Sequence, residues 1–142
     1  MATNEGFVLD GSVTMVWGFD DEASPYADAI LDRMPDLQAH VPGLWTLEVA
    51  NALLVGERRR RTTPADSARF LAILASFPIT VDDQTAARAW HETTHLARAH
   101  NLSAYDASYL ELAIRLGVSL ATLDDKLKTA AEAVGVPLFA VH

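Results

Sequence analysis

Apolar residues fall into short runs that alternate with longer segments in which they recur every three or four positions. The short runs at 7–9, 39–41, 79–81, 118–121 and 138–141 predict strands. The longer segments predict helices, and Ser or Thr followed by Pro marks the start of two of them. The predicted helices cover residues 13–19, 24–35, 44–61, 63–78, 84–101, 103–116 and 124–134. Strands and helices therefore alternate along the chain.

The predicted strands show no alternation between apolar and polar positions, which is typical of strands covered on both faces. Together with the intervening helices they predict an α/β fold of three layers, with a central parallel β-sheet flanked by helices. Its 142 residues contain no internal repeat, linker or low-complexity tract, so we expect one domain over 1–142. Within it, Ser12 is predicted to be the N-cap of the first helix, and 44–61 a long, mostly buried helix.

Composition narrows the class of protein. The chain has 19 acidic and 11 basic residues, a formal net charge of -8, which disfavours non-specific coating of nucleic acids. It has no cysteine, so a disulfide framework, a thiolate metal site and a cysteine nucleophile are excluded. Residues 1–6 lack the pattern of a secretory signal, and the longest nearly apolar stretch, 44–55, is too short to span a membrane. We expect a cytoplasmic protein with no membrane partner.

Four acidic residues stand where a carboxylate is costly or where strands end. Asp10 directly follows the first predicted strand, and Asp124 follows the run at 118–121. Asp106 lies in the first turn of the helix that begins after Ser103, and Glu48 lies among the apolar residues of 44–55. Ligands of open α/β sheets bind at the carboxyl ends of the strands, so these acids are candidates for one site.

Each acid also has a structural explanation, and for Asp10 it is capping of the first helix, a position that Ser12 already fills. Asp106 completes a Ser-x-x-Asp pattern that resembles a capping box, and Asp124 or its neighbour Asp125 would cap the last helix. Glu48 would lie on a solvated stripe with Asn51 and Arg58. Taken singly the acids favour these structural roles, but as a set they favour a shared site.

A shared site of several carboxylates resists joint ionisation unless a cation is present. Mg²⁺ and Mn²⁺ suit such a site because hard divalent ions take oxygen ligands. The matching chemistry is metal-assisted hydrolysis of a phosphodiester, in which the metal activates water, orients the phosphate and stabilises charge on the leaving oxygen.

Four segments carry a resemblance to a known family, and they occur in the same order along nearly the whole chain. The chain resembles the PIN-domain ribonucleases of the VapC toxin type. The most specific parts are Tyr105-Asp106-Ala107 and Thr122-x-Asp124. The four segments are Val8-Leu9-Asp10-Gly11-Ser12, Trp45-x-x-Glu48-x-x-Asn51-x-Leu53, Leu102-Ser103-x-Tyr105-Asp106-Ala107-x-Tyr109-Leu110-x-Leu112-Ala113 and Ala121-Thr122-Leu123-Asp124.

The resemblance implies an endoribonuclease that depends on Mg²⁺ or Mn²⁺ and acts as the toxin of a type II toxin–antitoxin pair. It also implies RNA as substrate, a cognate VapB-like antitoxin as inhibitor, and a homodimer that forms a higher assembly with the antitoxin. By the same resemblance the catalytic and metal-binding acids are Asp10, Glu48, Asp106 and Asp124, supported by Ser12, Thr122 and Asn51. Gly11 departs from the Ala, Thr or Ser common at its position, and Asp125 competes with Asp124 for the fourth acidic place.

A run of arginines closes the helix predicted at 44–61. Arg58, Arg59, Arg60 and Arg61 are four of the chain's 11 basic residues. One interpretation is a solvated helix end whose cations complement the helix dipole. The other is contact with RNA phosphates or with an acidic part of the antitoxin.

Three further interpretations compete with a nuclease. His91-Glu92-Thr93-Thr94-His95 matches the HExxH pattern of zinc proteases, but chance produces such a match and Arg88 and Arg98 share the face of its two histidines. A non-catalytic PIN-like scaffold is disfavoured by the complete set of four acids. A Mg²⁺-binding regulatory domain requires an acid pair just after the first strand, whereas the clustered acids at 20–22 lie too far along.

The aromatic residues Trp17, Trp45, Trp90, Tyr26, Tyr105 and Tyr109 lie at helical spacings among aliphatic residues. Packing in the core or at an interface explains this placement better than stacking on nucleobases. No glycine-rich phosphate loop is present, which argues against dinucleotides and ATP.

Overall fold

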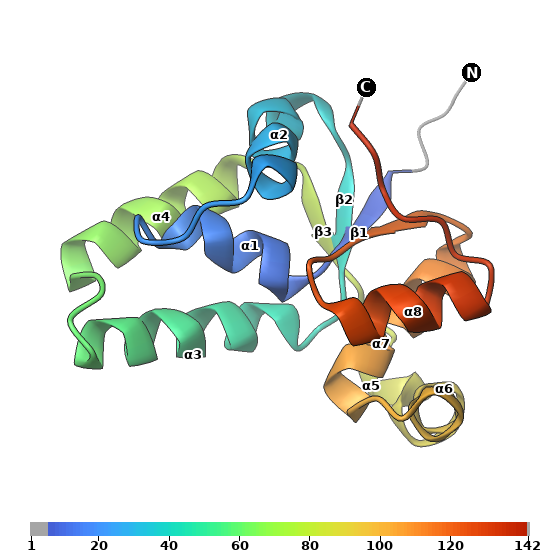
Figure 1. Ribbon diagram of the computed structural model, residues 1–142. Coiled ribbons are helices and arrows are strands. Elements are labelled where there is room, and N and C mark those ends of the chain that lie inside the picture. Colours follow the sequence, from blue (N-terminus) through green and yellow to red (C-terminus); the bar gives the residue numbers. More distant parts are fainter. Residues whose placement is uncertain (1–5, 142) are drawn as a thin grey trace.

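The computed structural model describes residues 6–141 and shows a parallel sheet with helices on both sides (Figure 1). Residues 1–5, for which no secretory signal is predicted, lie outside the described part. Within it the sheet has four strands in the order β3-β2-β1-β4, and all three strand pairs are parallel. The strands are β1 (Phe7–Leu9), β2 (Ala39–Val41), β3 (Ile79–Val81) and β4 (Ser119–Ala121). The predicted α/β class with a central parallel sheet is confirmed.

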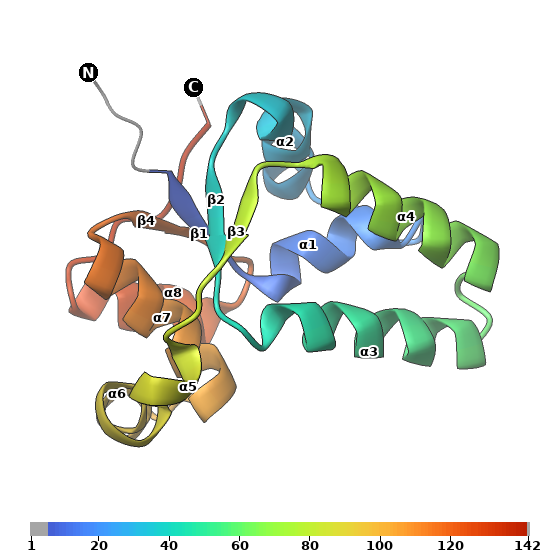
Figure 2. The same cartoon turned by 180° about the vertical axis from the view of Figure 1, so that it is seen from behind.

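The strand order explains which helices cover which face. The chain steps outward from β1 to β2 to β3 and then returns to place β4 on the other side of β1, so right-handed connections put the two sets of helices on opposite faces. Figures 1 and 2 show this separation of the helices by the sheet. One face carries α1 (Gly11–Gly18), α2 (Pro25–Arg33) with the 3₁₀ helix η1 (Met34–Asp36), α3 (Trp45–Arg58) and α4 (Pro64–Ser76). The other carries α5 (Thr85–Arg88), η2 (Ala89–Thr93), α6 (Thr94–His100), α7 (Ala104–Leu116) and α8 (Asp125–Ala133).

The core is built around β1 and α7. All three residues of β1 are fully buried, and α7 buries seven consecutive residues from Ala107 to Ala113. Burial on both faces of β1 explains why the strand sequence shows no alternation. None of the helices within residues 6–141 is long and apolar enough to cross a membrane.

Three predicted helix starts are confirmed, and one is wrong. The side chains of Ser24, Thr63 and Ser103 each accept a hydrogen bond from a backbone N–H of the following turn. Ser12, in contrast, lies inside α1, whose N-cap is Asp10. The Ser12 hydroxyl donates to the Asp10 carboxylate at 2.6 Å instead, so its role is to hold that acid.

The helix predicted at 44–61 is shorter and more exposed than expected. It ends at Arg58, because Arg60 takes a positive φ of 60°. Its outer face faces solvent, with Leu47 74% exposed. The apolar residues of this segment therefore do not all pack in the core. Gly56 is needed where it is, since a Cβ there would lie 2.4 Å from the Phe19 ring.

Two further elements differ from prediction. The segment 84–101 is divided into α5, the π-helix η2 and α6, and the Thr94 hydroxyl donates to the Ala89 carbonyl, five residues back. The last strand, expected at 138–141, forms only one isolated bridge, between Leu120 and Leu138. Two backbone hydrogen bonds support this bridge, from Leu120 to Pro137 and from Phe139 to Leu120, and Phe139 also stacks on Phe7, with ring centroids 4.1 Å apart.

Candidate active site

The four predicted acids line one cavity of about 480 Å³ at the carboxyl ends of the strands. Asp10 follows β1 and Asp124 follows β4, and these neighbouring strands flank the point where the chain reverses direction across the sheet. This crevice is where open α/β sheets bind ligands. Each acid also lies at a helix N-terminus: Asp10 and Asp124 are N-caps, and Glu48 and Asp106 lie in first turns. Four helix dipoles therefore favour negative charge at this cavity.

Asp10 is the most deeply buried of the four acids and is only 6% exposed. Its Oδ2 accepts hydrogen bonds from Ser12 at 2.6 Å and from Thr122 at 2.7 Å. Burial nevertheless raises the pKa of Asp10 above its ordinary value, and the nearby charges of Asp106 and Asp124 raise it further against the effect of the two hydroxyls. The ionised form of this carboxyl is costly in the free protein.

Ser12 and Thr122 connect Asp10 to the chain segment between β4 and α8. The Ser12 oxygen accepts from the Leu123 N–H at 3.0 Å, and the Thr122 oxygen accepts from the Asp124 N–H at 3.0 Å. Each hydroxyl thus donates to Asp10 and accepts from this segment. The two residues expected to support the acids fix the relative positions of β1 and β4 at the cavity.

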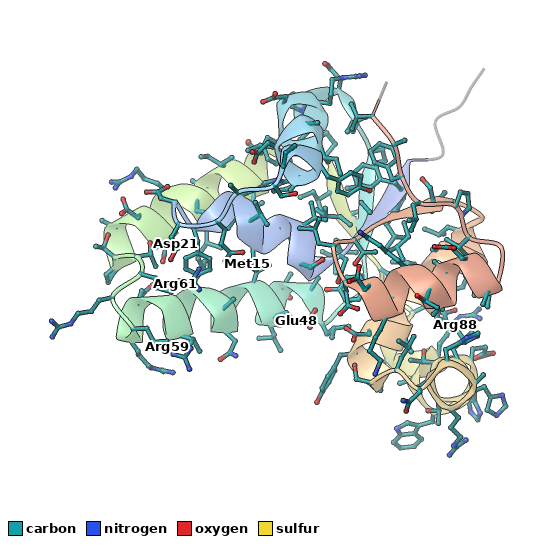
Figure 3. The ribbon with its side chains drawn as sticks, in the orientation of Figure 1. Met15, Asp21, Glu48, Arg59, Arg61 and Arg88 are labelled. Carbon is teal, nitrogen blue, oxygen red and sulfur yellow. The ribbon has the colours of Figure 1, made fainter. Side chains whose placement is uncertain are left out.

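Glu48 extends from the start of α3 towards α7, where the buried Tyr109 hydroxyl donates to its carboxylate. Figure 3 shows Glu48 at this end of α3. Burial raises the pKa of Glu48, and the charges of Asp10 and Asp106 raise it further, while the hydrogen bond from Tyr109 lowers it. Tyr109 was predicted only as a packing residue, so its contact with Glu48 is a site feature that the sequence did not disclose.

Asp106 and Asp124 combine a structural position with a place at the cavity. Ser103 accepts from the Asp106 N–H at 3.0 Å, and Asp124 itself accepts from the Leu127 N–H at 3.1 Å, so both predicted caps are present. The pKa of Asp106 is raised by burial and by the charge of Asp124, and lowered by Ser103 and Lys126. The structural and the chemical interpretation of these two acids are therefore compatible.

The donor set of the cavity suits a hard divalent cation. Carboxylates whose pKa is raised by one another's charge gain stability when a cation binds between them. Within residues 6–141, no three His, Asp or Glu side chains converge closely enough to form a closed metal site. A site of the Mg²⁺ kind does not require such closure, because Mg²⁺ is commonly held by one or two carboxylates together with waters and substrate phosphates.

Other predicted residues lie elsewhere. Asn51 is exposed on α3 and does not contribute to the cavity lining, and Asp125 is exposed and lies on another surface. Glu22, which no motif singled out, does line the cavity. Its carboxylate also accepts from Arg61 at 2.8 Å.

The four arginines of the run at 58–61 differ in their contacts. Arg58, Arg59 and Arg60 are exposed. Arg61 turns back, donates to Asp21 at 2.8 and 3.0 Å, and stacks over Phe19 at 4.0 Å (Figure 3). This contact ties the end of α3 to the α1–α2 connection, so Arg61 has a structural role.

The histidines of the HExxH match lie away from the cavity. His91 is in the π-helix η2 and His95 is in α6, and both are exposed, as is Glu92. The regular α-helical turn that places two such histidines on one metal is interrupted between them. The geometry gives no support to a zinc protease.

The PIN-domain sequence profile matches residues 7–133, which include all four acids and nearly every element described. The chain belongs to the PIN-domain family. Over 130 residues this PIN domain is 28% identical to Ribonuclease VapC3 of Pyrobaculum aerophilum, covering 92% of this chain and 98% of that protein.

Solved structures share the fold of this PIN domain. VapC20 of Mycobacterium tuberculosis, described as a sarcin–ricin loop cleaving toxin, superposes with a TM-score of 0.62 at 17% identity over 87% of this chain and 94% of that one. FitAcB of Neisseria gonorrhoeae superposes with a TM-score of 0.64 at 18% identity over 94% and 96% of the two chains. These likenesses confirm the predicted VapC-like PIN fold.

Proposed function

We propose that this PIN domain is an endoribonuclease dependent on Mg²⁺ or Mn²⁺ and that it acts in the cytoplasm as the toxin of a VapBC-type pair. One observation carries the proposal: four carboxylates line a single cavity at the strand ends, and the pKa values of three are raised by burial and by neighbouring negative charge. The similarity to a protein named Ribonuclease VapC3 supports RNA as the substrate.

In the proposed mechanism, Asp10, Asp106, Asp124 and Glu48 hold the cation, directly or through water. When bound, a divalent cation would lower the pKa of a water, orient the phosphate and offset charge on the leaving oxygen. Ser12 and Thr122 hold the Asp10 carboxylate by donating to its Oδ2. Tyr109 on α7 holds Glu48 in the same way, so hydrogen bonds within the protein orient both acids.

The acids can be tested with a matched control. We expect Asp10→Asn and Asp106→Asn each to abolish metal-dependent RNA cleavage and growth arrest while the protein stays folded. Asp125→Asn is the control, because it removes the same charge one residue from Asp124 on a side chain that is 98% exposed. Cleavage retained after Asp10→Asn, or lost equally after Asp125→Asn, would refute the assignment.

Inhibition by a VapB-like antitoxin and formation of a homodimer are further parts of the proposal, supported by an apolar surface. Leu71 on α4 and Val81 on the edge strand β3 are 44% and 45% exposed. Both line a cavity of about 280 Å³ between α3, α4 and β3. Exposed apolar patches of this kind mark protein interfaces.

Co-expression tests this part of the proposal. A protein encoded beside the toxin gene should co-purify with it and stop RNA cleavage, and Leu71→Asp should weaken that complex while leaving cleavage by the free protein intact. Full inhibition by the neighbouring protein despite Leu71→Asp would remove this surface from the proposal.

A further inference from the structure

A second cavity lies beside the acids, and we propose that it binds a nucleobase of the RNA strand whose phosphate occupies the acid cavity. The inference rests on the proposed function and names a specificity site for it. The cavity, called the base pocket below, has a volume of about 300 Å³. Its walls include Gly43, Leu44, Thr85, Ala89, Tyr105 and Ser108.

The base pocket and the acid cavity share two helix N-termini. On α7, Tyr105 lines the base pocket and the next residue, Asp106, lines the acid cavity. Leu44, just before α3, lines the base pocket, and Glu48, one turn later, lines the acid cavity. The two cavities are therefore lined by consecutive residues of α7 and by residues one turn apart at the start of α3.

Two hydroxyls in the walls of the base pocket, those of Thr85 and Ser108, are already hydrogen-bonded within the protein. The Thr85 hydroxyl donates to Asp82 at 3.0 Å and accepts from the Gly43 N–H at 2.8 Å. The Ser108 hydroxyl donates to the Tyr105 carbonyl at 2.6 Å. A ligand here gains contact with flat apolar surface rather than new hydrogen bonds, which suits the face of a base.

Tyr105 is 67% exposed, so packing in the core, one of the two placements predicted for it, is wrong. An exposed aromatic ring next to the acids offers a surface on which an unpaired base can stack. Stacking is tolerant of sequence, because every base has a flat π face. We therefore expect the base pocket to select single-stranded or flipped-out nucleotides more strongly than one particular base.

Size and position favour a base over a segment of a protein partner. The volume is at the lower end of the roughly 300 to 1,000 Å³ found for small-molecule pockets. That volume fits a planar ring, whereas an amphipathic helix requires an extended groove. The pocket also adjoins the acids, so a strand cut at the acid cavity must pass beside it.

The test combines protein variants with RNAs that lack single bases. The probe is a short single-stranded RNA spanning a bond that the wild-type protein cuts. Every variant also carries Asp10→Asn, so that the RNA stays uncut while its binding is measured. Tyr105→Ala removes the stacking surface, and Ala89→Leu fills the pocket while keeping the ring. Trp90→Ala is the matched control, since Trp90 is an aromatic residue 88% exposed on η2 that does not line the pocket.

We expect removal of one base beside the cleaved bond to lower the affinity about tenfold, in line with measured base–aromatic stacking. Tyr105→Ala and Ala89→Leu should each lower the affinity for the intact RNA by a similar factor. The missing base should then cause no further loss in these variants, and Trp90→Ala should change neither affinity.

Other outcomes overturn the inference. The base pocket is refuted if the losses from Tyr105→Ala and from the missing base multiply, or if Trp90→Ala weakens binding equally. It is also refuted if Tyr105→Ala leaves RNA affinity unchanged and instead weakens a complex with another protein chain, measured by sedimentation. In all these cases wild-type cleavage stays intact and the proposed function stands, whereas a wild-type protein that cuts no RNA refutes both.

Discussion

Replacing Tyr109 by Phe removes one hydroxyl from the core and leaves Glu48 without the phenol that donates to it. The ring is 1% exposed and stays the same size, so packing should be preserved. Hydrogen bonds to charged groups contribute roughly 1.5–3 kcal/mol, and because Glu48 is partly solvated we expect a loss near the lower end, about 1.5–2 kcal/mol near neutral pH. For a chain of this length that lowers Tm by about 5–9 °C.

The loss should depend on pH in a defined direction. The pKa of Glu48 is raised in the folded protein, so ionising this group costs stability as pH rises from its unfolded value through its folded value. The Tyr109 hydrogen bond lowers the pKa of Glu48 and so reduces this cost. At about pH 4 and below, Glu48 is protonated in the fold and Tyr109→Phe should cost only about 1 kcal/mol, as for a neutral hydrogen bond.

Thermal and urea unfolding in the presence of a chelator measure the loss in the free energy of unfolding at neutral and at acidic pH. Tyr26→Phe is the matched control, because the Tyr26 hydroxyl donates to the neutral carbonyl of Phe139 at 2.6 Å. Tyr26→Phe should lower the free energy of unfolding by about 1 kcal/mol at both pH values. An equal loss for Tyr109→Phe at acidic and neutral pH would show that Glu48 is not stabilised as an anion by this contact.

Two further outcomes follow from the charges of the molecule. After metal has been removed with a chelator, adding MgCl₂ should stabilise the wild-type protein against unfolding. The gain should be about 2.7 kcal/mol when the free Mg²⁺ concentration is a hundred times Kd. This stabilisation by MgCl₂ should shrink as pH falls through the raised pKa values of Asp10, Glu48 and Asp106, because protons then compete with the cation for the same oxygens. A stabilisation that is independent of pH, or that is unchanged in Asp10→Asn, would contradict a metal at these acids. Arg61→Gln should lower the Tm measured by calorimetry by a few degrees at low salt, whereas the control Arg59→Gln should leave it unchanged. Equal effects of the two substitutions would contradict the structural contact of Arg61 with Asp21.

The parts of the fold that local sequence dictates could be predicted. Short apolar runs located β1 to β4, and Ser or Thr before a helix located the starts of α2, α4 and α7. The exposure of Leu47 could not be read from its spacing, because periodicity shows that a helix forms but not how far it extends beyond the sheet. The run at 138–141 has strand composition, yet its pairing depends on distant residues and stops at one bridge.

The site shows the same limit. The acids were identifiable because strand ends and helix starts are local signals. Tyr109 and Arg61 act on partners 61 and 40 residues away in the chain, so only the fold reveals them. Tyr109 follows Asp106 by three residues, so the two side chains are neighbours on α7. This spacing is equally typical of a residue that only packs in the core.

The distribution of charge is compatible with the proposed action of so acidic a chain on RNA. The formal charge is -8, and five acids line one cavity, Glu22 and the four predicted ones. Hydroxyls from Ser12, Thr122 and Tyr109 and the N-termini of four helices offset part of the repulsion between these acids. A bound cation would relieve the rest and reverse the local field at the place where a phosphate must approach. Under the proposed function the overall charge would not attract RNA, so the substrate would be held by contacts next to that cation, and the proposed base pocket would provide affinity that needs no positive surface.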